Sequence, residues 1–583
     1  MTIPELIGLA VALCFAYPWA LVVVPPPRSP VITALTTVAL SLGGMTLGMM
    51  TLALVAPGLL NLGVIGGLMA LVFALGAWWL LEAEVVRGGA ASVRTVIAQA
   101  RRAARASPLA AGAVVVPVVM GALILFNAGY LPFGDQDAIA IYGRLGRWVY
   151  LNRTLPVGEG LFEAYPMLVP LSYTYTHLLA ESQNEYLARL APAALSVGAM
   201  AAAYALGRAL YGLRTGVAAA ALLALTPTYT RWASAGYADL PAAFFFTMSA
   251  LFAWRLYKSG RARDAALAGI MAGLAMWTKN GALTLAASLP LWIAYTRLHA
   301  RRWPGDASGQ PVAPRCAALA LGAAALTAGP WYARNLLLFG VIVPPTGWAW
   351  LAQRTLANLV PFAAYPEAYF APGLVFLAGI AACLGWAARG DARAAMLLIF
   401  AAPFFAVWWA LFSYETRFLL MILPLVAVMG GRALDAALAR IQLHISAELP
   451  GSYPASMGLQ WAALALLVAL ALPAASKAVM HKDDFLRNPL MDNTARHRLQ
   501  TGPAFAVSAY LNDHTPAGAR VLSTVLYVDY YADPDFEVVY NPPAREGYDY
   551  WVLAPGEEAN PPPGALLAEI DGAKIYKATR HDE

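Results

Sequence analysis

Acidic side chains gather in one polar stretch of an otherwise apolar chain. Asp135 and Asp137 lie near the start of the stretch 129–190, and Glu163 lies in its Gly/Pro-rich middle, two residues before Tyr165. A carboxylate can take the proton of a nucleophile or orient it for attack. Long apolar runs flank the stretch, so these acids would lie at a membrane surface. This placement suits chemistry on a lipid-borne substrate.

Each of these acids also has a simpler structural interpretation. Asp135 and Asp137 precede an amphipathic helix pattern that carries Arg144 on its polar face. Negative charge at the start of that helix would cap its backbone. Asp137, two residues beyond Asp135, would point elsewhere and could bind substrate or a divalent metal. Glu163 could equally be a solvated loop charge.

Isolated charges at the ends of apolar runs form a second group, which consists of Asp239, Lys279, Arg334 and Arg417. Ionisable residues at such places are costly and are usually paired or functional. The three cations could stabilise a phosphate as it leaves, or they could extend to lipid phosphates. Asp239 could bind substrate, or it could cap the span that follows it.

The composition indicates a polytopic membrane protein. Of the 583 residues, 60% are hydrophobic and 12% are charged, whereas soluble proteins carry about 25% charged residues. The net charge of +6 does not indicate nucleic acid, because most basic residues lie in short loops between apolar runs. Cys14, Cys316 and Cys383 lie in or beside such runs and offer neither a disulfide framework nor metal-ligand spacing.

About fourteen apolar runs are long enough, at roughly 15–25 residues, to be read as membrane spans. The first lacks a basic leader and a cleavage site, so we interpret it as a span and not as a removed signal. The approximate ranges are 4–24, 31–55, 59–82, 109–128, 191–210, 214–229, 238–256, 263–278, 281–297, 316–330, 371–388, 395–413, 418–431 and 458–476.

Basic residues set the expected orientation. With 83–108 in the cytoplasm, twenty Lys and Arg fall on the inner side and nine on the opposite side, the tail excluded. This bias follows the positive-inside rule. The stretch 129–190 and the tail would face the periplasm or exterior, with the protein in a bacterial inner membrane. Residues 83–108 are basic and alanine-rich, which predicts a cytoplasmic amphipathic helix.

Three parts follow from these patterns. Residues 1–108 hold additional spans and the cytoplasmic segment, and 109–476 form the main membrane domain with its outer loop. In the tail, 477–583, a helix pattern is followed by short strand-like runs such as Val521–Leu526. Helix and strands separated by Pro/Gly turns predict a small α/β domain outside the membrane. The fold class is therefore all-α and membrane-spanning, with amphipathic helices in the outer loop and this α/β addition.

Five short motifs occur in an order that one enzyme family shares. They are the loop acid with Tyr165-Pro166-Met167-Leu168, then Tyr237-Ala238-Asp239-Leu240-Pro241, Trp277-Thr278-Lys279-Asn280-Gly281, Pro330-Trp331-Tyr332-Ala333-Arg334-Asn335 and Tyr414-Glu415-Thr416-Arg417-Phe418. From about residue 109 to 583 the chain thereby resembles the GT-C membrane glycosyltransferases, which include protein O-mannosyltransferases and lipid A aminoarabinose transferases. It departs from them in its three additional N-terminal spans and in Asp-Gln-Asp, which stands in place of the more common Asp-Glu pair.

The resemblance implies an activity and roles for these residues. The enzyme would transfer a hexosyl or pentosyl group from a polyprenyl-phosphate donor to a lipid, glycan or protein acceptor. Asp135 would be the base, with Asp137 and Glu163 as further acids. The donor phosphate would bind the three cations named above, and substrate would also contact Asp239, Tyr165 and Arg144. The sequence shows no glycine-rich nucleotide loop, which favours a lipid-linked donor over a sugar nucleotide.

Two other functions remain open. A transporter or flippase for a lipid-linked or amphiphilic substrate would predict polar residues at mid-membrane and inverted repeats. A non-catalytic scaffold or sensor would not need acids and cations on one face. The charges collect at the outer ends of spans and in outer loops, which favours the transferase. The sequence indicates no definite cofactor, although Asp135 and Asp137 could bind a divalent metal.

Overall fold

The computed structural model describes residues 1–25, 28–82, 108–160, 162–303, 309–343, 349–448, 453–542, 547–557 and 564–578. The amphipathic helix predicted over 83–108 falls outside these ranges except for its last residue. The chain forms two compact units. The first contains Met1–Asn127 and Leu145–Met480, and the second contains Ala128–Arg144 and His481–Glu583.

The first unit is built from helices, two of which have an end that belongs to the second unit: the last three residues of α6 (Pro108–Tyr130) and the first residue of α7 (Arg144–Asn152). Its longer helices are α1 (Ile3–Cys14), α2 (Tyr17–Val23), α3 (Pro30–Val55), α4 (Leu62–Glu82), α6 (Pro108–Tyr130), α7 (Arg144–Asn152), α8 (Leu168–Ala180), α9 (Glu185–Tyr211), α10 (Leu213–Ala224), α11 (Pro227–Ala233), α12 (Asp239–Ser259), α13 (Ala262–Thr278), α14 (Leu285–Arg302), α15 (Pro314–Phe339), α17 (Pro366–Ala388), α18 (Ala392–Val407), α19 (Leu423–Glu448) and α20 (Tyr453–Ala478). Short turns of helix join them: η1 (Pro57–Leu59), η4 (Asn280–Thr284), η5 (Ala349–Leu351), η6 (Ala357–Leu359), α16 (Pro361–Ala364), η7 (Trp408–Phe412) and η8 (Thr416–Met421).

Nine helices in the described ranges are long and apolar enough to cross a membrane, by length and composition. Two shorter apolar helices lie at Leu213–Ala224 and Ala462–Ala478. The predicted spans 263–278, 281–297 and 418–431 fall on α13, α14 and α19 with the short turns η4 and η8. These helices confirm the predicted all-α, multi-pass membrane fold.

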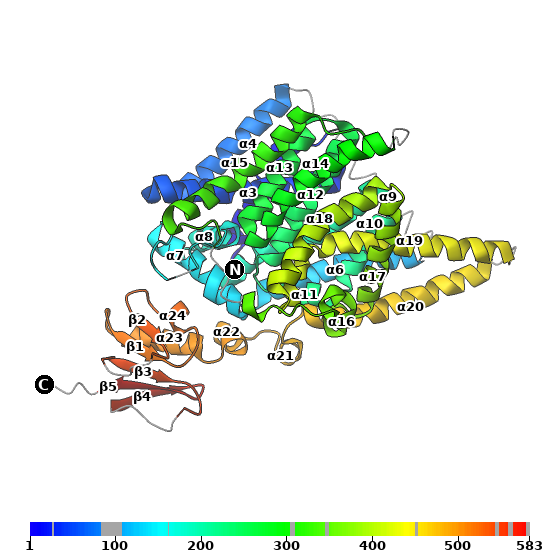
Figure 1. Ribbon diagram of the computed structural model, residues 1–583. Helices are drawn as coiled ribbons and strands as arrows, with labels where there is room; N and C mark the ends of the chain where they lie inside the picture. The colour runs from blue at the N-terminus through cyan, green and yellow to red at the C-terminus, as the bar shows by residue number, and fades with distance from the viewer. Residues whose placement is uncertain are drawn as a thin grey trace. The chain divides into compact units, whose positions relative to one another are not determined.

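Helix α12 is the most deeply buried of these spans. Its most apolar window is 94% buried, against 22% for α4, so α12 is a core helix and α4 presents most of its surface outward. Helix α12 packs against α9 and α13 (Figure 1). Phe244, Phe245 and Phe246 are each fully buried. A helix that is apolar on all faces must be covered by neighbours or lipid, and here protein covers it.

Two glycines let α15 pack closely on α13. A Cβ at Gly269 would lie 2.0 Å from the carbonyl oxygen of Ala320, and one at Gly273 would lie 2.4 Å from Cβ of Thr327. Small residues four positions apart allow this close helix approach in membrane proteins. The contact brings the ends of α13 and α15 together, and Tyr332 of α15 donates to the carbonyl of Met276 at 2.9 Å.

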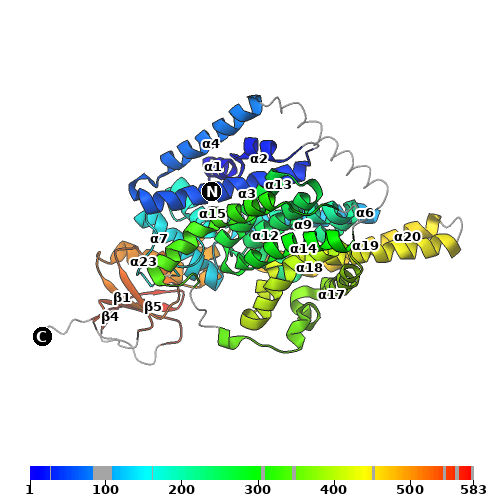
Figure 2. The same ribbon diagram turned by 45° about the horizontal axis from the view of Figure 1, so that its top comes forward.

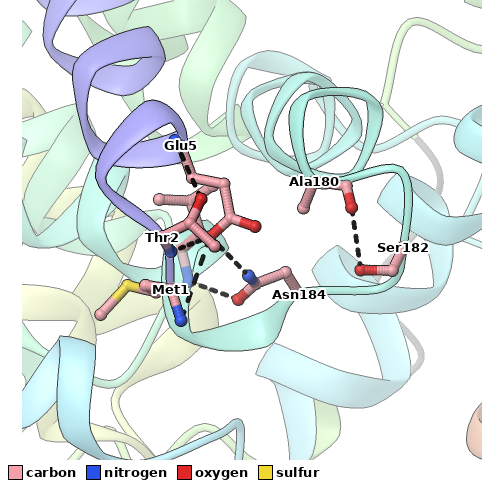
Figure 3. A network of polar contacts seen from close by, with 7 residues as sticks. Met1, Thr2, Glu5, Ala180, Ser182 and Asn184 are labelled. Carbon is pink, nitrogen blue, oxygen red and sulfur yellow. Dashed lines mark hydrogen bonds and ion pairs between the residues drawn. The ribbon is translucent and has the colours of Figure 1, made fainter.

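The N-terminal helices pack onto the main bundle (Figure 2). Thr2 and Glu5 form a capping box at the start of α1, which satisfies two backbone donors. Glu5 also accepts from Nδ2 of Asn184 at 3.5 Å, and Asn184 itself caps α9. Figure 3 shows these groups converging between α1 and the turn that follows α8. The additional N-terminal segment is therefore tied to the first turn of α9.

The second unit contains a five-stranded sheet of order β2-β1-β3-β5-β4. Its strands are β1 (Arg520–Ser523), β2 (Glu537–Tyr540), β3 (Tyr550–Leu553), β4 (Gly564–Ile570) and β5 (Ala573–Ala578), and its helices are α21 (Lys482–Arg487), α22 (Asn493–Thr501), α23 (Ala504–His514), α24 (Val528–Tyr531) and the π-helical turn η3 (Ala138–Gly143). β1 is parallel to β2 and β3, whereas β5 is antiparallel to β3 and β4. This confirms the predicted small C-terminal α/β fold.

A buried core joins the sheet of the second unit to α23. It contains Val507 and Leu511 from α23 with Val521, Val552 and Ile575 from the strands. The segment Ala128–Arg144 belongs to the same unit. Its Tyr130 ring lies 4.4 Å from the Arg496 guanidinium and 5.0 Å from the Phe485 ring. The stretch 129–190 is thus divided: its first residues join the C-terminal part of the chain, and the rest joins the helical unit.

Candidate functional site

An ion pair joins the start of α12 to the end of α13. Nζ of Lys279 lies 2.5 Å from Oδ1 of Asp239. The two helices form an antiparallel hairpin that turns at Gly260, whose φ of 63° is left-handed and favours glycine. The hairpin places the first residue of α12 beside Lys279, which caps the end of α13 in an extended conformation. Both residues stand out in the sequence as isolated charges, and they form a pair in the fold.

Asp239 is the inner partner of this pair. Its side chain is 1% exposed, whereas that of Lys279 is 18% exposed. The second carboxylate oxygen, Oδ2, is buried and finds no hydrogen-bond partner in the described part of the chain. A carboxylate behind a lysine fixes the position of the ammonium and offsets part of its charge. This geometry fits Asp239 as a residue that orients Lys279.

Aromatic rings surround the neighbouring cation, Arg417 of η8. Its guanidinium carbon lies 4.4 Å from the centre of the Tyr237 ring, 4.8 Å from Trp232 and 5.1 Å from Phe418. The ammonium of Lys279 lies 4.7 Å from the same Phe418 ring. Cations at these distances are attracted to the ring face. Lys279 and Arg417 therefore flank one aromatic ring at the same end of the helical unit.

Trp232, Tyr237 and Phe418 are the site residues that sequence reasoning did not assign. Tyr237 and Phe418 stand in the motifs quoted above, beside Asp239 and Arg417. Their aromatic character was the available signal, but aromatic residues near span ends are mostly interface anchors. Only the packing of η8 against α12 brings the three rings around the cations. We call Asp239, Lys279, Arg417 and these rings the cationic cluster.

Glu163 and Arg334 lie in a second arrangement that holds a loop. The Glu163 carboxylate accepts from the backbone N–H groups of Gly158 and Glu159 at 2.8 and 2.5 Å. Arg334, on the last turns of α15, donates to the carbonyl oxygens of Glu163 at 3.1 Å and Pro156 at 2.9 Å. Both charged groups thereby bind backbone atoms of Pro156, Gly158, Glu159 and Glu163, which precede Tyr165.

Tyr165 continues this arrangement. Its ring meets that of Phe162 edge to face, with the centres 5.4 Å apart. Asn335, next to Arg334, donates to the carbonyl oxygen of Ala164 at 3.1 Å. Side chains from α15 thus hold the backbone just before Tyr165 in one position.

Asp135, Asp137 and Arg144 lie in the second unit. Arg144 forms an ion pair with Asp529 of α24, and Ile139 donates its N–H to the carbonyl oxygen of Asp135 at 3.2 Å. Asp137 directly precedes η3, and within the described segment 128–144 its side chain makes no capping hydrogen bond to that turn. Single π-helical turns are rare and are frequent at functional sites.

The pKa of Tyr527, which lies just before α24, depends on the charges around Asp135 and Asp137. Burial raises the pKa of the Tyr527 hydroxyl, Arg144 opposes this rise, and the negative charges of Asp135 and Asp137 add to it. The two acids and Tyr527 are therefore close enough to interact electrostatically. In the described residues no group of three His, Cys, Asp or Glu side chains could hold a metal ion, so a metal at the two acids stays a prediction.

Comparisons with known proteins agree with this architecture. Residues 165–306 match the family model described as Dolichyl-phosphate-mannose-protein mannosyltransferase, while no curated protein matches the chain. ArnT from Cupriavidus metallidurans bound to undecaprenyl phosphate is similar in structure, with 14% identity, a TM-score of 0.54 and coverage of 80% of this chain and 98% of that chain. Its apo form gives 17% identity, a TM-score of 0.51 and the same coverage.

Proposed function

Because the chain is a multi-pass membrane protein with the fold of the GT-C membrane glycosyltransferases, we propose that it transfers a sugar from a polyprenyl-phosphate donor. The resemblance inferred from the sequence motifs is confirmed at this level. The acceptor would be the hydroxyl or similar nucleophile of a lipid, glycan or protein. The observation that carries the proposal is the cationic cluster, where two cations converge at one end of the helical unit.

Lys279 and Arg417 would bind the donor phosphate. Charge-assisted hydrogen bonds from Arg and Lys to phosphate are strong, and they become stronger as negative charge develops on the leaving oxygen. The pairing of Lys279 with Asp239 at 2.5 Å keeps the ammonium in place before the donor arrives. The rings around Arg417 exclude water on that side, which strengthens its interaction with an anion.

Asp135 would be the base, with Asp137 as a further acid that binds sugar hydroxyls or a metal. The acceptor oxygen would form a bond to the anomeric carbon of the sugar. The bond from that carbon to the phosphate oxygen would break, and its electron pair would leave with polyprenyl phosphate. The acceptor proton would pass to the Asp135 carboxylate and then to water.

Glu163 and Arg334 fit a supporting role better than their predicted roles. The Glu163 carboxylate and the Arg334 guanidinium both bind backbone atoms of the residues just before Tyr165, among them Pro156 and Gly158. A loop held on both sides would keep Tyr165 in a fixed place, where it could contact sugar or acceptor. Positioning of this kind contributes to catalysis because a small displacement from the productive geometry slows the reaction.

The expected location of the site follows from the unequal numbers of Lys and Arg in the loops on the two sides of the membrane. The start of α12, the end of α13 and the turn before α19 all belong to the predicted outer side. The proposed site therefore faces the periplasm or exterior of a bacterial cell, with the protein in the inner membrane. A lipid-linked donor suits this side, since nucleotide sugars are made in the cytoplasm.

The experiment that tests the function uses purified protein in detergent or vesicles. The protein is incubated with a panel of polyprenyl-phosphate hexoses and pentoses together with a membrane extract as the source of acceptor, and the release of polyprenyl phosphate is followed. We expect release with at least one donor, and its loss in a Lys279→Gln/Arg417→Gln double variant. Turnover of a sugar nucleotide, with none of the lipid-linked donors consumed, would contradict the proposal.

A further inference from the structure

A cavity of about 270 Å³ lies at the other end of α12 from the cationic cluster. Its lining consists of Pro25, Ala209, Trp254, Arg255, Lys258, Ser259, Arg261 and Asp264. Helix α12 has 21 residues, so at 1.5 Å per residue its two ends are about 30 Å apart. That length is the thickness of the hydrocarbon core of a bilayer. The predicted topology therefore places the cavity and the cationic cluster at opposite membrane surfaces.

Three separate parts of the chain build this cavity. Pro25 follows α2 in the additional N-terminal segment, Ala209 lies in the last turn of α9, and the other lining residues belong to the α12–α13 hairpin. The hairpin is held firmly at this end. The N–H of Gln310 donates to the carbonyl oxygen of Tyr257 at 2.9 Å, and Sγ of Cys316 lies 3.6 Å from that of Gly260.

The acid in the cavity wall is already neutralised. Asp264 is 1% exposed and accepts from Nε of Arg255 at 3.1 Å and from the hydroxyl of Ser259 at 2.5 Å. Within the part of the chain that the structure describes, no carboxylate pairs with Lys258 or Arg261. Both of these side chains are exposed at the cavity rim. The cavity thus carries two positive charges in excess.

The wall below these cations is apolar. Pro25 and Trp254 are buried, and the Trp254 ring is tilted against two neighbouring aromatic rings, with ring centres 5.4 Å from Tyr257 and 6.3 Å from Trp292. An apolar wall beneath a cationic rim complements an amphiphile with a negative head. A free inorganic anion would match the rim but would leave the apolar wall without a partner.

We propose that this cavity binds the phosphoryl head group of an anionic membrane phospholipid. The phosphate would lie between Lys258 and Arg261, and the first carbons of the lipid would lie against Trp254 and Pro25. Each basic residue near an anionic lipid surface strengthens binding about fivefold. The bound lipid would connect the additional N-terminal segment to the core hairpin, and it would stabilise the folded protein by mass action. This site is independent of the proposed transferase activity.

The test measures thermal unfolding of the full-length protein in a neutral detergent. Phosphatidylglycerol, phosphatidylcholine and inorganic phosphate are titrated separately. We expect phosphatidylglycerol to raise the unfolding midpoint. The half-saturating concentration should rise by about 25-fold in Lys258→Gln/Arg261→Gln, since two charges are removed.

A matched control variant separates this site from general surface charge. Arg389→Gln/Arg440→Gln removes two exposed arginines of the same predicted side that do not line the cavity, and it should titrate like the wild type. If the cavity variant has a lower midpoint before lipid is added, Lys258→Gln alone should still show a shift of about fivefold. Equal titrations in the two double variants, or a midpoint that responds equally to phosphatidylcholine, would overturn the proposal. The proposal would also be overturned if inorganic phosphate raised the unfolding midpoint at concentrations similar to those of phosphatidylglycerol.

Discussion

Lys279 and Asp239 are forty residues apart in the sequence, and their charged atoms are 2.5 Å apart in the fold. The pair is largely shielded from water, because Asp239 is 1% exposed. Removing one partner of a buried pair leaves an uncompensated charge, whereas removing both can be nearly neutral. The pair thus links the stability of the α12–α13 hairpin to the arrangement of the proposed phosphate site.

The first prediction concerns this pair. Lys279→Met should destabilise the protein by about 3–5 kcal/mol, because Asp239 remains buried and unpaired. Asp239→Asn/Lys279→Met should recover a large part of that loss, which would appear as a coupling energy in a double-mutant cycle. Chemical unfolding in detergent of the wild type, Asp239→Asn, Lys279→Met and the double variant measures this coupling energy. The control is Lys477→Met, an exposed lysine whose loss should change little. If the losses of stability in Asp239→Asn and Lys279→Met simply added in the double variant, the coupling would be contradicted.

The second prediction concerns the proposed base. Asp135→Asn keeps the size of the side chain but cannot accept the acceptor proton, so turnover should fall by about a hundredfold or more. Binding of the lipid donor should change little. Asn caps a helix about as well as Asp, so a purely capping role predicts near-normal turnover. Donor consumption and the thermal midpoint are measured together. Full turnover by a stably folded Asp135→Asn variant would show that Asp135 is not the base, and Asp137 would then be the candidate.

The third prediction concerns Gly143, which ends the π-helical turn in the second unit. A Cβ there would lie 2.7 Å from the carbonyl oxygen of Ala138 and 3.0 Å from the hydroxyl of Tyr530. Gly143→Ala must therefore displace backbone, and overpacking typically costs about 1–3 kcal/mol. Faster hydrogen exchange over 128–144 and lower turnover are expected. Gly322→Ala, with open space around the new methyl group, is the control. Unchanged exchange in Gly143→Ala would refute the close packing.

The fourth prediction is a pH dependence that arises from His177 in α8. Burial lowers the pKa of His177 to about 3, and Arg147 adds to this. An unfolded histidine binds a proton below about pH 6.5, while the folded one stays neutral. The contribution of neutral His177 to the free energy of unfolding is therefore fully present above about pH 6.5. It is lost as the pH falls, at up to about 1.4 kcal/mol per pH unit.

His177→Gln removes the titrating group, so its unfolding midpoint should fall less steeply than that of the wild type between about pH 6.5 and pH 4. His514 is exposed, and His514→Gln serves as the control with a wild-type slope. Thermal melts at half-unit pH intervals provide the measurement. Parallel slopes for wild type and His177→Gln would show that His177 is not responsible.

The fifth prediction concerns orientation. Cysteine labelling in intact cells should modify Gln183→Cys, in the predicted outer loop, and should not modify Arg101→Cys in the predicted cytoplasmic segment. Cys14 is exposed whereas Cys316 and Cys383 are buried, so the experiment uses a Cys14→Ser background. Labelling of Arg101→Cys without Gln183→Cys would reverse the assignment and place the cationic cluster in the cytoplasm.

Local patterns in the sequence were sufficient for the class of the protein and for most of its helices. Apolar runs predicted α3 and α12 within three residues at each end, and they predicted α9 and α17 except for the first five or six residues of each. A membrane span needs about 20 consecutive apolar residues, and this requirement is met locally. The charges at the ends of these runs could be recognised for the same reason. Asp239, Lys279 and Arg417 stand out because each is isolated among apolar neighbours.

The tertiary structure alone decided which of these charges meet. Lys279 faces Asp239 because α12 and α13 form a hairpin, and Arg417 joins them because η8 packs on α12. Likewise Arg334 reaches the carbonyl of Glu163 from a position 171 residues away in the chain. Periodicity describes one element at a time, and it contains no information about the crossing of two helices. Side-chain contacts of this kind depend on ångström-scale packing, which is why they appear only in the fold.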